Sequence, residues 1–271
     1  MPDRHPVVAG RFYSADPRRL QHEIKMLLDP APCMFDTLAL MLPHAGHMFC
    51  GSIIGQTLGA AKLPSTLVLL CPNHSGKGKA LAVWPKGEWH TPLGALEVDA
   101  NFAACCIQTN SGFEADLDAH ATEHSLEVLL PFLQIHSPGV RIVPVAVALN
   151  DLEGLRRAAQ GLALCMEEEN NAGRSVSIVI SSDMNHFENQ ELTVQKDTRA
   201  LATLLELDPE KLFTTVRTER ISMCGVCPAT LGLFACKIMG AQKAELVAYG
   251  TSASVNGDTG RVVGYAGVRI Y

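Results

Sequence analysis

The sequence lacks features that would define several whole classes of protein. None of its 271 residues belongs to an uncharged apolar run close to the roughly 18 residues of a membrane-spanning helix. Residues 1–6 are charged and interrupted by proline, where a secretory signal needs an apolar stretch. No serine-, glycine- or proline-rich linker divides the chain. We therefore expect a single cytoplasmic domain over residues 1–271, with no membrane partner.

Clustered positive charge is also missing. Lysine and arginine number 22 against 28 aspartate and glutamate residues, which gives a net charge of −6. The longest basic clusters are the arginine pairs at 18–19 and 156–157. Proteins that bind nucleic acid present a dense basic surface, so direct nucleic-acid binding is not expected.

Cysteine is present in an odd number, nine, which argues against a framework of paired disulfides. Reduced thiols behave as small hydrophobic groups, and five cysteines lie inside apolar segments: Cys71, Cys105, Cys106, Cys165 and Cys236. Any cysteine chemistry is therefore expected to be metal ligation or catalysis.

Short apolar runs rich in β-branched residues alternate with helix-length segments. This pattern is typical of a sheet covered by helices on both faces, and near-continuous hydrophobicity indicates strands buried on both sides. We predict a three-layer α/β/α fold with a mostly parallel sheet, whose strands cover residues 37–42, 65–71, 141–148, 175–181, 245–249 and 261–271, with an edge strand at 79–85. The predicted helices cover residues 51–62, 100–111, 124–135, 152–170, 191–205 and 227–239.

Three of the predicted strands run directly into loops that carry histidine. His44, His74 and His186 follow the strands that end near residues 42, 71 and 181. Parallel strands bring such loops to one edge of the sheet, where α/β proteins bind ligands. Imidazole ligates iron, copper and zinc and titrates near neutral pH, so this cluster suits metal binding, proton transfer or both.

A cysteine adds a further candidate ligand. Cys224 precedes the helix predicted from residue 227, and the positive end of a helix favours a thiolate. Its spacing from Cys227 also fits a redox pair or half of a zinc site.

A competing metal motif spans residues 120–124. His120, Glu123 and His124 match the H-x-x-E-H pattern of a zinc metalloprotease, with two ligands one helical turn apart. The alternative interpretation is that Glu123, His124 and Glu127 cap a helix and point into the cavity formed by the strand-end loops.

Short motifs along the whole chain resemble the Memo family, whose prokaryotic members include AmmeMemoRadiSam system protein B. The motifs are Pro43-His44-Ala45-Gly46, Asn73-His74, Thr91-Pro92-Leu93-Gly94, Glu123-His124-Ser125-Leu126-Glu127, Ser181-Ser182-Asp183 with His186, Cys224-Gly225, and Val263-Gly264-Tyr265-Ala266. The resemblance implies a fold similar to class III extradiol dioxygenases, which are non-haem iron enzymes.

By this resemblance, two histidines and a cysteine hold the metal, and they correspond to His44, His74 and Cys224. The resemblance implies iron(II) first, with copper or zinc as alternatives. His47 stands where the family has a tyrosine, and serves either as an extra ligand or as a replacement for that ring.

Two classes of function follow from this site. One is an oxidoreductase in which His186, supported by Asp183, acts as acid or base while His124 completes the pocket wall. The other is a non-catalytic module that captures a metal, a small molecule or a peptide in the same pocket. The family association also implies partner proteins of the radical SAM and AMMECR1 types.

Overall fold

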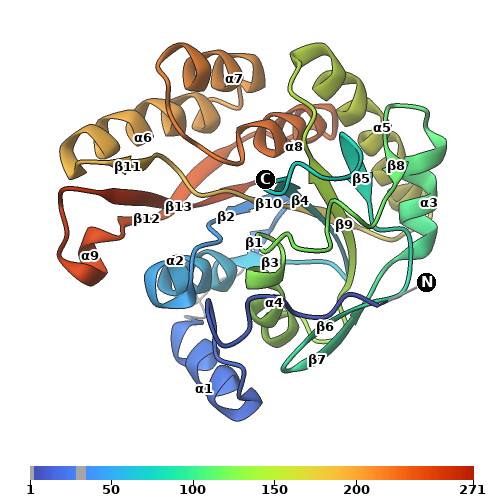
Figure 1. Cartoon of the computed structure of the whole chain (residues 1–271). Coiled ribbons are helices and arrows are strands. Elements are labelled where there is room, and N and C mark those ends of the chain that lie inside the picture. Colours follow the sequence, from blue (N-terminus) through green and yellow to red (C-terminus); the bar gives the residue numbers. More distant parts are fainter. Residues whose placement is uncertain (1–2, 29–34) are drawn as a thin grey trace.

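A computed structural model describes residues 3–28 and 35–271 of the chain. Its centre is a sheet whose inner strands are parallel and follow the order β2-β10-β4-β9 (Figure 1). These strands are β2 (Ala39–Leu42), β10 (Val176–Ser181), β4 (Thr66–Pro72) and β9 (Arg141–Val147). All four coincide closely with predicted strands.

Antiparallel strands extend this parallel core on both sides. β13 (Val262–Ile270) pairs with β2, and both β12 (Ala244–Thr251) and β11 (His186–Glu188) pair with β13. On the other side β5 (Leu81–Val83) pairs with β9, and β8 (Glu114–Ala115) pairs with β5. The prediction of an edge strand near β5 was therefore wrong, because β8 covers its outer side. Two short pairs complete the strands: β1 (Phe35–Asp36) with β3 (Ala61–Lys62), and β6 (Glu88–Thr91) with β7 (Gly94–Glu97).

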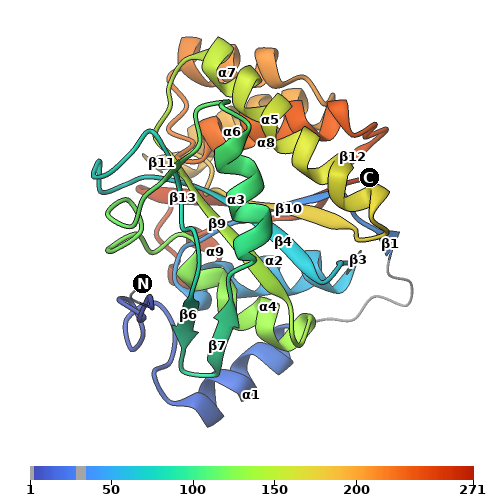
Figure 2. The same ribbon diagram turned by 90° about the vertical axis from the view of Figure 1, so that its right-hand side faces the viewer.

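Helices cover both faces of the sheet, which confirms the three-layer prediction (Figures 1 and 2). One face packs against α1 (Pro17–Leu27), α2 (His47–Gly59) and α4 (Leu130–His136). The other face packs against α3 (Ala100–Gln108), α5 (Leu152–Asn171), α6 (Gln190–Leu205), α7 (Pro209–Thr218) and α8 (Val226–Ile238). The buried short helix η1 (Glu127–Leu129) leads directly into α4, and the exposed short helix α9 (Ala253–Asn256) follows β12.

The central strands are buried on both sides because successive side chains point to opposite faces. In β4, Val68 and Leu70 join the core beneath α5 and α8, whereas Leu67 and Leu69 join the core beneath α2 and α4. Every residue of β4 is buried. This two-sided burial explains the continuous apolar runs in the sequence.

The four-residue α9 and two longer helices, α1 and α7, were not predicted, although the sequence carries a signal for the two longer ones. Asp16 caps α1 and Asp208 caps α7, and in both cases proline occupies the first helical position. An aspartate that accepts a backbone N–H, followed by proline with its preset φ, is a strong helix start. Both helices are strongly amphipathic but contain few apolar residues, because each buries only a narrow stripe, and the prediction followed segments richer in apolar residues.

No helix within the described part of the chain combines the length and the apolarity that a membrane crossing requires.

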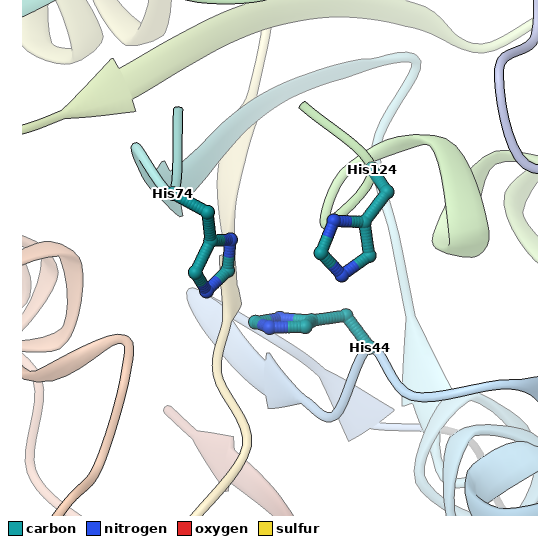
Figure 3. A group of neighbouring side chains, drawn as sticks. All are labelled: His44, His74 and His124. Atoms are coloured by element: carbon teal, nitrogen blue, oxygen red, sulfur yellow. The ribbon is translucent and has the colours of Figure 1, made fainter. Parts of the chain in front are cut away.

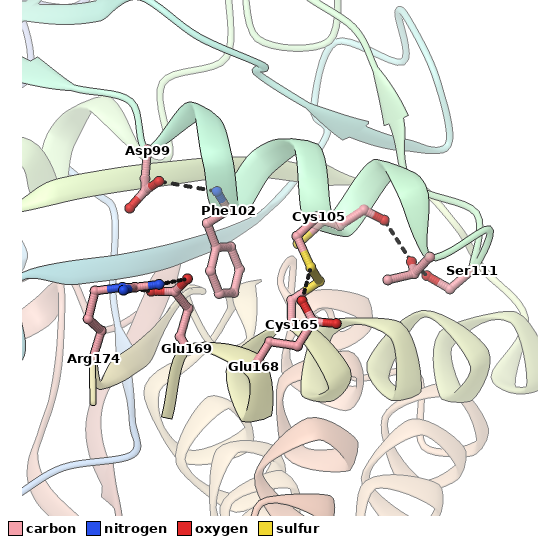
Figure 4. Close-up of a disulfide and its surroundings, with 10 residues drawn as sticks. Asp99, Phe102, Cys105, Ser111, Cys165, Glu168, Glu169 and Arg174 are labelled. Atoms are coloured by element: carbon pink, nitrogen blue, oxygen red, sulfur yellow. Dashed lines mark hydrogen bonds and ion pairs between the residues drawn. A yellow bond between two sulfur atoms is a disulfide. The ribbon is translucent and has the colours of Figure 1, made fainter. Parts of the chain in front are cut away.

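Cys105 and Cys165 form a disulfide, which corrects the expectation that both are reduced thiols (Figure 4). The bridge joins α3 to α5, which pack on the same face of the sheet. The two Cα atoms are 6.0 Å apart. These residues are 60 positions apart in the sequence, so only the packing of the two helices brings them together. The enclosed loop contains Glu123 and His124.

Reduction of this disulfide should lower the stability of the protein. Closure of a loop of this length restricts the unfolded chain and stabilises the fold by about 4 kcal/mol. Urea unfolding with and without dithiothreitol measures the effect. A Cys105→Ser/Cys165→Ser double variant should match the reduced parent and show no response to dithiothreitol. Equal unfolding midpoints for the oxidised and reduced parent would contradict the expectation.

Candidate metal centre

Three neighbouring parallel strands end at one site. His44 follows β2, Asp183 follows β10 and His74 follows β4. The adjacency of these strands in the sheet places the three loops side by side, as their common direction predicted. His124, from the loop before η1, joins them, and the ligand atoms of His44, His74 and His124 all lie within 4.8 Å of one another (Figure 3).

A hydrogen bond from the His44 ring to Ser181 fixes the tautomer of His44, because Ser125 determines the direction of the Ser181 hydroxyl. The Ser181 hydroxyl donates its only proton to the Ser125 carbonyl at 2.7 Å. It can therefore only accept from Nδ1–H of His44, at 2.7 Å. The Nε2 lone pair of His44 is left for a ligand. Burial and the neighbouring imidazoles of His74 and His124 lower the pKa of His44 well below its usual value, so the ring is neutral.

Glu123 orients His74 in the same way. Its carboxylate accepts the His74 backbone N–H at 2.6 Å and the ring Nδ1–H at 2.9 Å. Burial alone raises the pKa of Glu123, but its contacts with His74 and Ser125 outweigh burial and leave the net pKa well below the usual value. The hydrogen bond with Glu123 raises the pKa of His74. The Nδ1 atom of His124 lies 3.5 Å from the same carboxylate, so Glu123 lies behind two of the three rings.

Cys224 lies beside His44 but does not share the full histidine cluster. Its Sγ atom is 3.4 Å from Nε2 of His44 and accepts the Asp183 backbone N–H at 3.2 Å. Desolvation and the Asp183 carboxylate raise the pKa of the Cys224 thiol. The Gly225 backbone N–H at the start of α8 does lower the pKa, but desolvation outweighs it, so the expectation of a lowered thiol pKa was wrong. Cys227 does not pair with Cys224 and instead contacts Asn150, with Sγ 3.5 Å from Oδ1.

Asp183 and His186 both face the cavity, but they are not hydrogen-bonded to each other among the described residues. The Asp183 carboxylate accepts the His44 backbone N–H at 2.8 Å, and burial raises its pKa. His186 is held by Ser222 instead, because its Nδ1–H donates to the Ser222 carbonyl at 2.9 Å. The Nε2 atom of His186 therefore keeps its lone pair.

A cavity of about 1170 Å³ opens above this cluster. Its floor includes the three histidines, Asp183 and His186, and its walls come from the N-terminal segment, α1 and α2. The sequence analysis did not identify the N-terminal wall or Tyr265, which also lines the cavity.

The H-x-x-E-H histidines do not converge. Residues 120–124 form turns rather than a helix, so the spacing of one helical turn does not apply. His120 is fully buried, and its Nε2–H donates to the Ala82 carbonyl at 3.0 Å. His47 likewise donates to the Val128 carbonyl at 2.8 Å and stacks on Tyr13, so it fills a packing position.

Comparison with known proteins agrees with this architecture. The family described as Memo-like protein matches residues 4–269. A MEMO1 family protein from Methanopyrus kandleri is 36% identical and one from Ignicoccus hospitalis is also 36% identical, each over 98% of both chains. A third, from Methanothermobacter thermautotrophicus, is 32% identical over 97% of this chain and 98% of its own. The chain belongs to the Memo family.

Buried His120 should make stability fall in acid. Burial lowers its pKa from 6.5 to about 4, so the unfolded chain binds a proton that the folded protein excludes. As pH falls through this window, the folded state should lose about 1.4 kcal/mol per pH unit, or about 3 kcal/mol in total. His120→Gln keeps a donor for Ala82 and does not titrate. As the pH falls, the advantage of the parent over the variant in unfolding free energy should therefore shrink by that amount. Unfolding free energies of the parent and the variant that change equally with pH would contradict the expectation.

Proposed function

We propose that this protein binds one first-row transition-metal ion through His44, His74 and His124, with Cys224 as a fourth donor. Iron(II) is the first candidate, and copper and zinc are ions that the same donors accept. The observation that carries the proposal is the convergence of three imidazoles whose ligand atoms lie within 4.8 Å of one another.

The orientation of the rings supports metal binding over simple packing. His44 and His74 each engage a protein acceptor through Nδ1, so Nε2 is the ring nitrogen left to bind a metal. Metal-binding histidines characteristically donate their second ring N–H to a carboxylate, a carbonyl or another oxygen acceptor. From the sequence we expected His124 to complete the pocket wall beside the acid or base, whereas its place in the cluster supports a role as ligand.

The place of Cys224 supports its role as an additional donor. Ligand bonds of about 2.1 Å to nitrogen and 2.3 Å to sulfur, at a tetrahedral angle, put the two atoms about 3.6 Å apart. The observed separation of His44 Nε2 and Cys224 Sγ is 3.4 Å. In the metal-free protein the thiol proton can bridge these atoms, and a bound ion would take its place, because metals bind thiolate.

The chemistry that fits this site is that of an oxidoreductase related to the class III extradiol dioxygenases. A bound iron(II) or copper ion would supply redox chemistry and polarise a coordinated ligand. His186 lines the cavity and uses Nδ1 in its bond to Ser222, so its Nε2 atom is placed to accept or return a proton. Asp183 holds the His44 backbone, which maintains the distance between the β2 and β10 loops.

A non-catalytic binding module is the second candidate, and the cavity rim favours it. Met26 and Met48 line the cavity and are 75% and 71% exposed, and Val255 adds a further exposed apolar side chain. Flexible methionines are common on surfaces that accept varied peptides. Anaerobic loading with iron(II), followed by oxygen uptake with catechols, separates the two: ring-opened product supports the enzyme, and tight metal binding without turnover supports the module.

Protein loaded with iron(II) without oxygen should hold one ion per chain. The triple variants His44→Ala/His74→Ala/His124→Ala and His44→Ala/His74→Ala/Cys224→Ser should both lose it, because each lacks two or more anchored ligands. Cys224→Ser alone should retain metal with weaker affinity. Elemental analysis and metal-edge absorption measure content and identity.

Three variants serve as controls for this experiment. His120→Gln changes a buried histidine outside the cluster, and Cys227→Ser removes a thiol that contacts Asn150, so both should keep a full ion. Glu123→Gln retains every proposed ligand but weakens the hydrogen bonds that orient His74. It should therefore lower the affinity for the metal about 10- to 100-fold. Stoichiometric metal in a folded triple variant would exclude the proposed site.

A further inference from the structure

Tyr265 has a buried ring and a hydroxyl without a protein partner. Its side chain is only 3% exposed and lines the cavity that contains the three histidines. Among the described residues no hydrogen bond engages its hydroxyl, and that oxygen is not one of the buried polar atoms sealed from solvent. The hydroxyl of this cavity-lining residue is therefore not used in a hydrogen bond to the described part of the protein.

The other tyrosines of the chain show that this is unusual here. Tyr13 donates to Glu127 at 2.8 Å, Tyr249 donates to Asp197 at 2.7 Å, and Tyr271 lies 3.4 Å from Glu245. A buried tyrosine hydroxyl normally finds such a partner. Tyr265 retains an unused donor at the place where a ligand would bind.

The sheet fixes the direction of this side chain. Val263 and Tyr265 are two positions apart on β13, so they point to the same face, and both line the cavity. Gly264 between them faces the opposite side, where a Cβ atom would overlap the carboxylate of Asp197. This close packing prevents the strand from slipping by one residue, which would turn Tyr265 away from the cavity.

The surroundings keep the hydroxyl in its donor form. Burial raises the pKa of Tyr265, and the nearby Asp183 carboxylate and the Cys50 thiol raise it further. The phenol therefore stays protonated at neutral pH. A protonated hydroxyl beside a metal centre favours a ligand that carries negative charge on its donor atom.

We propose that Tyr265 is a ligand-contacting residue, whose hydroxyl donates a hydrogen bond to an anionic oxygen or nitrogen donor bound at the metal. This inference rests on the proposed metal site and adds the chemical class of the ligand. The ligands that fit are carboxylates, ionised phenols or enols, and small inorganic anions. Tyr265 selects the charged form because only that form accepts a strong hydrogen bond.

Azide binding to the cobalt(II)-loaded protein tests this role without any assay of activity. Titration followed by the visible d–d absorption of cobalt gives the dissociation constant. Tyr265→Phe keeps the ring and removes only the hydroxyl, so azide should bind about tenfold more weakly, the equivalent of one hydrogen bond. Cobalt content and melting temperature should match the parent, since no protein hydrogen bond is lost.

Tyr13→Phe is the matched control, because Tyr13 lines the same cavity but its hydroxyl already donates a hydrogen bond to Glu127. This variant should melt at a lower temperature and bind azide like the parent. Equal azide affinity in the parent and in Tyr265→Phe at equal cobalt content would overturn the inference. Failure of the parent itself to take up one cobalt ion would instead remove the metal site, and this inference with it.

Discussion

A single buried carboxylate, that of Glu123, organises the histidine cluster. Glu123 holds His74 through both its backbone and its ring, and it accepts the backbone N–H and the hydroxyl of Ser125. The Ser125 carbonyl then accepts from Ser181, which in turn accepts from Nδ1 of His44. One continuous chain of hydrogen bonds therefore orients the imidazole rings of His44 and His74, which lie on loops that follow different strands. Such a network is stable in the interior because each of these contacts pairs a donor with an acceptor.

The N-terminal segment is tied to the same loop by a second buried carboxylate. Glu127 forms an ion pair with Arg4 at 2.8 Å and also accepts N–H groups of Val7 and Val8 and the hydroxyl of Tyr13. Arg4 reaches back to the carbonyls of His120 and Glu123. A buried ion pair offsets its desolvation only when such additional hydrogen bonds are present. The wall of the cavity and the support of the metal ligands are thus one polar structure.

The cavity combines two kinds of surface. Its floor carries imidazoles, a carboxyl group and a phenol, whereas its rim carries exposed methionines from α1 and α2. A ligand that matches both surfaces would place a charged donor atom at the histidine cluster and an apolar body against the rim. The open rim allows the ligand to be part of a larger molecule.

Much of the fold was predictable because strand burial leaves a direct trace in the sequence. Continuous apolar runs identified β2, β4, β9 and β10, and the rule that parallel strands share an edge placed His44 and His74 together. The helices α1 and α7 were missed because the analysis followed apolar-rich segments, whereas these two amphipathic helices contain few apolar residues and are marked by the aspartate–proline starts at residues 16 and 208. The segment at residues 124–135 began later than predicted, at η1, because Glu123 and Glu127 bind distant partners instead of capping a helix.

The sequence by itself determined the layered architecture, the family and the strand-end histidines, since all three depend on local pattern. Only the tertiary structure decided that His124 joins the ligand cluster, that Ser222 rather than Asp183 supports His186, and that Cys105 meets Cys165. Each of these depends on contacts between segments far apart in the chain. Their direction and distance follow from how the helices and loops pack against the sheet, which local pattern does not encode.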